Sequence, residues 1–150
     1  MLKANDEQTR EVLREALAND PYFEVRSWAA QVLGEQCGTD DEIERVLFAA
    51  LDDDSPEVVV QALSALGKVG RSGDLLERLR LFYLHPNWQF RHGVILAFIE
   101  FLRRGILQPE QLQDDLDQVL ASTPYFKPVF ILNERLHELS DMVRSTAPAP

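Results

Sequence analysis

Residues 20–26 read Asp-Pro-Tyr-Phe-Glu-Val-Arg, and the pattern returns in residues 85–91 as His-Pro-Asn-Trp-Gln-Phe-Arg. Both copies place an aromatic residue two positions after the proline and an arginine five positions after it. Residues 123–129, Thr-Pro-Tyr-Phe-Lys-Pro-Val, form a looser copy, and residues 55–58, Ser-Pro-Glu-Val, form a partial one. The chain therefore repeats a short segment, which is typical of solenoids and other helical arrays.

The spacing of the repeat sets the number of units. The position of Val25 recurs at Val58, Phe90 and Pro128, so successive copies are 33, 32 and 38 residues apart. Four units of that length nearly fill the 150 residues. We expect units at about residues 7–38, 39–73, 74–106 and 107–144 of one domain, 1–144, with a disordered tail at 145–150.

Each unit has the apolar period of two helices. After the first proline, Val25, Ala29, Val32 and Leu33 lie at i, i+4, i+7 and i+8, and the two later copies keep this spacing. A second apolar periodic segment precedes each proline, for example over residues 12–17 and 43–51. Since no stretch alternates as a strand would, the sequence predicts an all-α fold of eight helices in four antiparallel pairs.

Prolines and glycines indicate where the helices begin and end. Pro21, Pro56, Pro86 and Pro124 are assigned structural roles at helix starts, because the missing proline N–H costs nothing in the first helical turn. Asp20, Ser55 and Thr123 precede three of them as candidate N-caps, and Thr39 with Glu42 forms a candidate capping box. The glycines are expected at helix ends: Gly34, Gly38, Gly67, Gly70, Gly73 and Gly105.

The first unit resembles a HEAT repeat. The residues that carry the resemblance are Asp20, Pro21, Glu24, Val25, Arg26, Ala29, Leu33 and Gly34, and the type is the short bacterial one also seen in phycobilisome lyase subunits. Tetratricopeptide and ankyrin units fit less well, because here proline opens the second helix and no Thr-Pro-Leu-His signature occurs. The resemblance implies a right-handed α-α superhelix, a HEAT-like α-solenoid.

The charge excludes some functions. The chain has 15 basic and 25 acidic side chains, and residues 1–75 carry 7 of the basic and 16 of the acidic ones. Phosphate binding needs clustered Lys and Arg, so we expect no nucleic-acid partner, which also argues against a HEAT-like DNA glycosylase. We expect no membrane binding either, and the lone Cys37 and the lack of a leader or apolar span favour a cytoplasmic protein.

No catalytic constellation stands out. The three histidines follow no metal-ligand spacing, and there is no phosphate-binding loop or nucleophile elbow. Cys37 is an ordinary thiol unless its pKa is lowered. We therefore predict no catalytic residue, no metal and no cofactor.

The second helices of a HEAT array present a row of side chains on the concave side. Once the shared core positions are removed, the columns are Trp28, Gln31 and Glu35; Gln61, Ser64 and Lys68; Gly93, Leu96 and Glu100; and Ile131, Glu134 and Glu138. Trp28 is distinctive, because its counterparts are Gln61 and Gly93 and the array demands no large side chain there. It is either an exposed binding anchor or a cap folded over the first-helix face.

Two further features allow two interpretations each. Arg26 and Arg91 could clamp an anionic ligand, but we favour a structural pairing, with Arg26 reaching the acidic run Asp52–Asp54. The helix expected over 90–102 is apolar nearly all round. It is either wrapped by the fourth unit, which we favour, or it forms a dimer or partner interface. We therefore expect a monomer or a weak homodimer through the aromatic C-terminal half.

The function predicted from these features is a non-enzymatic scaffold or adaptor that binds a partner protein on the ladder of second helices. The candidate binding residues are Trp28, Gln31, Glu35, Gln61, Ser64, Lys68, Leu96 and Glu100. An acidic rim of Glu24, Glu35 and Glu57 around Trp28 favours a partner with a basic segment. The alternative is a bilin lyase-like or chromophore-chaperone subunit, which follows from the repeat resemblance alone.

Overall fold

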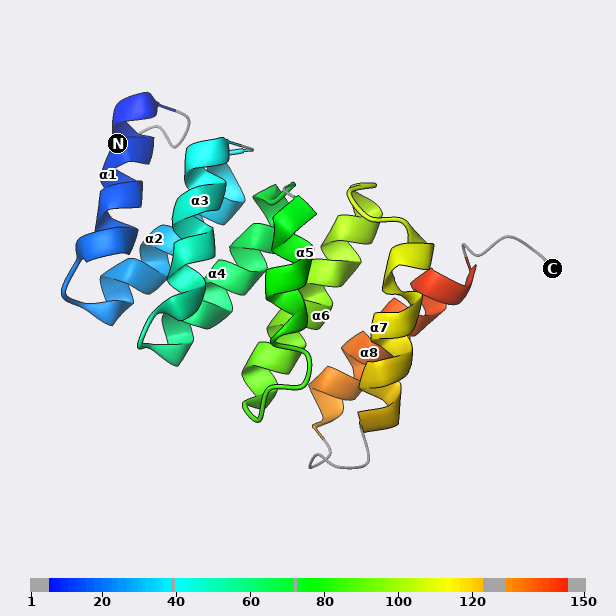
Figure 1. Ribbon diagram of the computed structural model, residues 1–150. Helices are drawn as coiled ribbons and strands as arrows, with labels where there is room; N and C mark the ends of the chain where they lie inside the picture. Colours follow the sequence, from blue (N-terminus) through cyan, green and yellow to red (C-terminus); the bar gives the residue numbers. More distant parts are fainter. Residues whose placement is uncertain (1–5, 39, 72, 123–128, 146–150) are drawn as a thin grey trace. The chain divides into compact units, whose positions relative to one another are not determined.

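The computed structural model describes residues 6–38, 40–71, 73–122 and 129–145. These residues form eight α-helices and one 3-10 helix, and no strand occurs among them. The elements are α1 (Glu7–Asn19), α2 (Phe23–Gln36), α3 (Asp41–Ala49), η1 (Ala50–Asp52), α4 (Pro56–Val69), α5 (Gly73–Arg80), α6 (Trp88–Arg103), α7 (Pro109–Ser122) and α8 (Phe130–Ser145). The predicted all-α fold of eight helices is confirmed (Figure 1).

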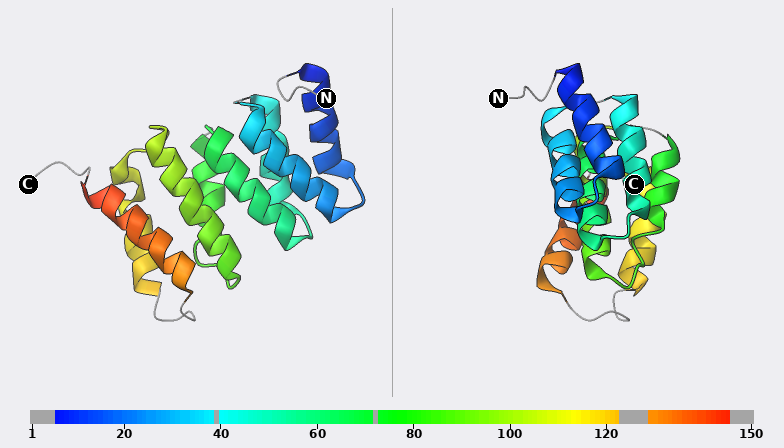
Figure 2. Two further views of the ribbon diagram at one scale, coloured as in Figure 1. Left: turned by 180° about the vertical axis from the view of Figure 1, so that it is seen from behind. Right: turned by 90° about the vertical axis from the view of Figure 1, so that its left-hand side faces the viewer.

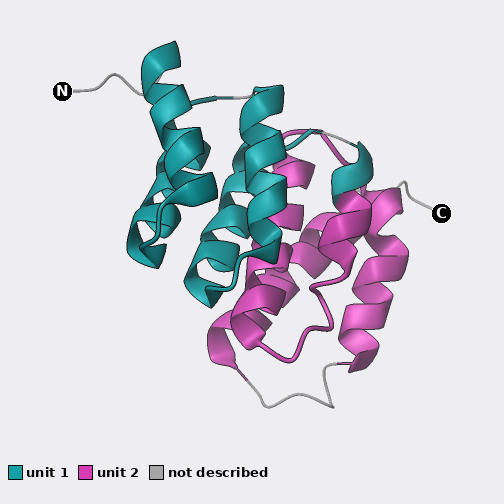
Figure 3. Ribbon diagram, turned by 60° about the vertical axis from the view of Figure 1, so that its left-hand side comes forward, with its two compact units in different colours: residues 1–75 teal, residues 76–150 magenta. Residues whose placement is uncertain are grey.

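The chain divides into two compact units, residues 1–75 and 76–150, and the division falls within α5 (Figure 3). In unit 1, α2 packs closely along α4, while α1 packs on α2 and α3 packs on α4 (Figure 2). The apolar positions of the sequence period are the ones that meet: Leu13, Leu17, Leu33, Ile43, Leu47, Val58, Leu63 and Leu66 are all buried.

Gly34 sets the distance between α2 and α4. A Cβ atom added to Gly34 would lie 2.6 Å from Ala65 Cβ and 2.7 Å from Ala65 Cα. Carbon atoms in contact normally lie about 3.5–4.0 Å apart, so only glycine permits this approach. The prediction that Gly34 and Gly67 end their helices is wrong, because α2 continues to Gln36 and α4 to Val69. Gly38 and Gly105 do follow helices in the left-handed conformation, with φ of 68° and 72°.

Several predicted helix starts differ in the structure. Ser55 precedes α4 and Pro56 occupies its first position, as predicted. α2, however, begins at Phe23 and α6 at Trp88, so Pro21 and Pro86 lie in the preceding turns. Each of these two prolines lies two residues before the first residue of its helix. The side chain of the preceding residue, Asp20 or His85, accepts a hydrogen bond within the turn, so the helix starts later. The Thr123–Pro124 pair and residues 146–150 lie outside the described residues.

The N-cap of α3 is Asp40, whose carboxylate accepts hydrogen bonds from the backbone N–H groups of Glu42 and Ile43. The capping box predicted at Thr39 is therefore wrong by one residue, and Thr39 itself is outside the described part of the chain. Aspartate caps as well as threonine does, so the sequence offered two neighbouring candidates.

In unit 2, α6 packs along α8, and α7 packs on α8. The apolar side chains of α6 point in several directions, and those of Phe90, Val94, Ile95, Ala97, Phe98, Ile99 and Phe101 are all buried. Leu96 and Leu102 are half-buried. This burial agrees with the interpretation that the chain itself covers the helix predicted over 90–102.

Candidate functional site

The predicted ladder in unit 1 forms two matching rows on α2 and α4. Glu24, Trp28, Gln31 and Glu35 follow one another at helical spacing on α2, and the residues 33 positions later, Glu57, Gln61, Ser64 and Lys68, do so on α4. Lys68 Nζ lies 3.6 Å from Glu35 Oε1, so the two rows are joined at equivalent positions. Gln31 Nε2 donates to the same carboxylate oxygen at 3.3 Å.

Trp28 is the one large apolar side chain of these rows, and 55% of it is exposed. Its neighbours in the α2 row are exposed polar or acidic side chains, whereas Gln61 and Ser64 on α4 are half-buried. An exposed tryptophan with a polar surround is the composition found at the centre of many protein interfaces. Of the two interpretations that the sequence leaves open, the exposure of Trp28 agrees with an accessible side chain rather than a cap folded over the first helix, and its role in binding stays a prediction.

The acidic rim is weaker than the sequence indicated. The Glu35 carboxylate is engaged by Lys68 and Gln31, which leaves Glu24 and Glu57 at the start of the two rows. Both are exposed. The Ser55 hydroxyl donates to the Glu57 carboxylate at 2.7 Å and lowers the pKa of that group, so Glu57 is a stable negative charge at neutral pH.

The predicted columns of unit 2 have a different character. Gly93 is buried, and Leu96 and Glu100 are half-buried. Arg103 donates to Glu100 at 2.8 Å and to Glu138 at 2.7 Å, and Arg135 also donates to Glu138. These four charged side chains thus bond to one another, and Leu96 is half-buried.

The two arginines that the repeat shares stabilise the turn before their helix. Arg26 Nη1 donates to the Asp20 carbonyl at 2.8 Å, and Arg91 Nη1 donates to the His85 carbonyl, also six residues back, at 2.6 Å. Arg26 in addition donates through Nε and Nη2 to both oxygens of Asp53, at 2.9 and 3.0 Å. The structural interpretation of Arg26 therefore agrees with its contacts.

Asp53 has a second bond, because its carboxylate accepts from the Ser55 backbone N–H at 2.9 Å. Burial alone would raise the pKa of Asp53, but the bonds from Arg26 and Ser55 outweigh it and leave that pKa below its usual value. Asp20 and His85 accept the equivalent bonds from Tyr22 N–H and Asn87 N–H. One turn geometry thus recurs before α2, α4 and α6.

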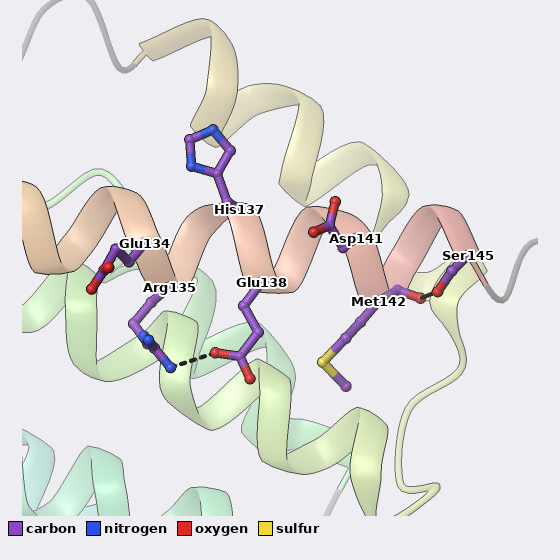
Figure 4. A pocket seen from close by; sticks show the side chains of 7 residues that line it. All are labelled: Glu134, Arg135, His137, Glu138, Asp141, Met142 and Ser145. Carbon is purple, nitrogen blue, oxygen red and sulfur yellow. Dashed lines mark hydrogen bonds and ion pairs between the residues drawn. The ribbon is translucent and has the colours of Figure 1, made fainter.

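The side chains that could carry chemistry do not converge. Burial raises the pKa of the Cys37 thiol, which keeps it protonated and weakly reactive. An open depression of about 550 Å³ runs along α8, and the side chains of His137 and Asp141 point away from those of Arg135 and Glu138 (Figure 4). Over the described ranges, no three His, Cys, Asp or Glu side chains gather as metal ligands would.

A family model described as HEAT repeats matches residues 10–99. The chain belongs to the HEAT-repeat family. The match covers more than half of the chain, including all of α2, α3 and α4, and it confirms the predicted HEAT-type α-solenoid class. No curated protein and no solved structure matches the chain significantly.

HEAT repeats generally act as protein-interaction scaffolds and are typically non-catalytic. Among the residues that the structure describes, no helix is long and apolar enough to cross a membrane.

Sequence reasoning missed the direction of Trp28 on its helix. Ala65 contacts Gly34, so the side of α4 that carries Val58, Gln61, Ala65 and Val69 faces α2. The equivalent residues of α2, 33 positions earlier, are Val25, Trp28, Val32 and Gln36. On α4, this side of the helix packs against α2. Trp28 lies on the corresponding side of α2, at the edge of the ladder. The signal was present in the repeat alignment, but only the contact at Ala65 assigns the side.

Proposed function

We propose that this HEAT-repeat protein is a non-enzymatic scaffold or adaptor, and that the rows of α2 and α4 in unit 1 bind a segment of a partner protein. The observation that carries the proposal is Trp28, which is 55% exposed beside a run of accessible polar side chains. Burying such a tryptophan contributes more to affinity than burying most other side chains. Gln31, one turn along α2 from Trp28, and Ser64, at the position on α4 equivalent to Gln31, supply hydrogen-bonding groups.

The charge of unit 1 favours a partner segment with Lys or Arg. Residues 1–75 carry nine more acidic than basic side chains, whereas residues 76–150 carry one more. Complementary charge raises the association rate and rejects acidic competitors. The same charge disfavours nucleic acid and anionic membrane surfaces.

A comparative pull-down tests the site. The bait variants are wild type, Gln31→Arg with Ser64→Arg, and a control with Gln89→Arg, an exposed glutamine on α6. We expect the double variant to lose proteins that wild type and the control retain, because two added cations repel a basic segment. If all three baits capture the same proteins, this face of unit 1 is not the binding site.

The alternative role, a bilin lyase-like or chromophore-chaperone subunit, has no site residue in its support. Mixing the protein with a linear tetrapyrrole and recording the absorbance spectrum tests it directly. We expect no spectral change.

A further inference from the structure

The side of α2 that carries Trp28 is accessible, whereas the equivalent side of α4 is covered by α2. On α4, Val58, Ala65 and Val69 are 0%, 2% and 3% exposed, and Gln61 is half-buried. On α2, the equivalent Val25 and Val32 are only half-buried, and Trp28 and Gln36 are exposed. The difference arises because α2 lies against this side of α4.

The first helix continues the same surface. The alignment of the first two repeats pairs Val12 with Val46 and Ala16 with Ala50. Val12 is 53% exposed whereas Val46 is half-buried, and Ala16 is half-buried whereas Ala50 is buried. We call the accessible set Val12, Ala16, Val25, Trp28 and Val32 the N-terminal flank.

We propose that the N-terminal flank binds an amphipathic α-helix of a partner protein, one with an apolar stripe and with Lys or Arg beside it. The helical form follows from the precedent within unit 1, where the equivalent stripe on α4 is covered by helix α2. An apolar stripe at i, i+3 and i+7 is complementary to a second helix rather than to an extended chain.

The positive charge of the partner helix follows from the margins of the flank. Glu11 and Glu15 are exposed beside Val12 on α1, and Glu24 is exposed beside Trp28 on α2. A second copy of this chain would bring two such acidic margins together, and like charges that face each other across an interface oppose association. The flank therefore selects a basic helix over its own copy.

This inference goes beyond the proposed ladder site. The two surfaces share Trp28, but Val12 and Val32 belong only to the flank, whereas Gln31 and Ser64 belong only to the ladder. Variants at these two pairs of residues therefore separate the two proposals.

The experiment uses the full chain and a phage library of 18-residue helical peptides, randomised along one stripe and its margins. We expect the enriched peptides to carry large apolar residues on the stripe and Lys or Arg beside it. Val12→Lys should weaken binding of the best synthetic peptide at least tenfold, and so should Val12→Lys combined with Val32→Lys. The first variant alters a side chain that is half exposed, so it retains the fold; circular dichroism checks this.

The matched control is Leu81→Lys, which makes the same kind of exchange at a leucine of unit 2 that is 68% exposed, and it should leave the dissociation constant unchanged. Gln31→Arg with Ser64→Arg should also leave it within about twofold. A peptide lost only from that ladder variant would support the ladder and overturn the flank.

Three other results would overturn the inference. They are a selection that enriches no peptide, a set of enriched peptides with acidic margins, and a best peptide that binds Val12→Lys as tightly as wild type. Light scattering measures whether the chain forms a dimer. A dimer that Val12→Lys dissociates would show that a second copy of the chain, and not a partner helix, occupies the flank.

Discussion

Gly34→Ala tests the contact that holds α2 against α4. The added Cβ would lie 2.6 Å from Ala65 Cβ and 2.7 Å from Ala65 Cα. Carbon contacts normally need about 3.5–4.0 Å, so the two helices must separate by roughly 1 Å. Because the clash includes the Ala65 backbone, no rotamer change relieves it.

The expected loss follows from two opposing effects. Overpacking of a well-packed core costs about 1–3 kcal/mol, and a clash with backbone belongs to the upper half of that range. Replacing glycine by alanine inside a helix returns about 1 kcal/mol of helix propensity. We therefore expect the free energy of unfolding of unit 1 to fall by about 1–2 kcal/mol.

Urea denaturation followed by Trp28 fluorescence, in a Trp88→Phe background, measures the change in unit 1. The control is Gly73→Ala in α5, where an added Cβ meets nothing within 4 Å and stability should stay the same or rise. Gly34→Ala combined with Ala65→Gly should not restore stability, because the 2.7 Å approach to the Ala65 Cα remains. A Gly34→Ala protein as stable as wild type would refute the assigned packing.

Three further predictions concern ionisable side chains that are half-buried. Arg26→Ala removes two bonds to Asp53 and should lower the free energy of unfolding by about 2–3 kcal/mol, whereas Arg45→Ala, at an exposed pair, should change it by less than about 0.5 kcal/mol. The pKa of Asp53 is lower in the folded protein than in the unfolded chain. Its contribution to the free energy of unfolding is therefore fully present above the ordinary aspartate pKa of about 3.9 and disappears as pH falls through the lower folded value. Asp53→Asn should remove this part of the pH dependence of stability in acid. Burial, together with Arg135, lowers the pKa of His92, so stability should hold above about pH 6.5 and decrease below it; His92→Phe should abolish that decrease and the exposed His137→Phe should not.

The arrangement of helices could be predicted because the repeat carries it in its apolar residues. Val25, Val58 and Phe90 mark equivalent positions. The residues at i, i+4, i+7 and i+8 from Val58 and from Phe90 are all buried, whereas in the first copy Val25 and Val32 are half-buried. Such spacing indicates which side of a helix packs against its neighbours in a helical array.

Helix starts were harder to predict because short polar residues serve both turns and caps. Asp20 was expected to cap α2, but its carboxylate accepts the Tyr22 N–H within the turn, and the helix begins later. Gly34 was expected to end a helix, but its lack of a side chain serves packing against Ala65. Local sequence cannot distinguish these uses, because they depend on what the neighbouring helix brings close.

The repeat alignment also drew attention to one residue of the candidate site. The repeat alignment identified Trp28 as a large residue in place of Gln61 and Gly93, and the structure places it at the surface. The flank that includes Val12 and Val32 was missed, because an apolar residue at a core-type position reads as core. Val12 and Val32 are recognised as accessible only when their burial is compared with that of the equivalent residues Val46 and Ala65.

Site-specific photo-crosslinking tests most directly whether partners bind at Trp28. The protein carries p-benzoylphenylalanine at position 28 or, as the control, at position 81, where Leu81 is 68% exposed against 55% for Trp28. The predicted result in a native lysate is a crosslinked partner protein at position 28, absent at position 81 and suppressed by an excess of a basic amphipathic helical peptide. Equal crosslinking at both positions, or none at position 28, would contradict the assignment of the binding surface to unit 1.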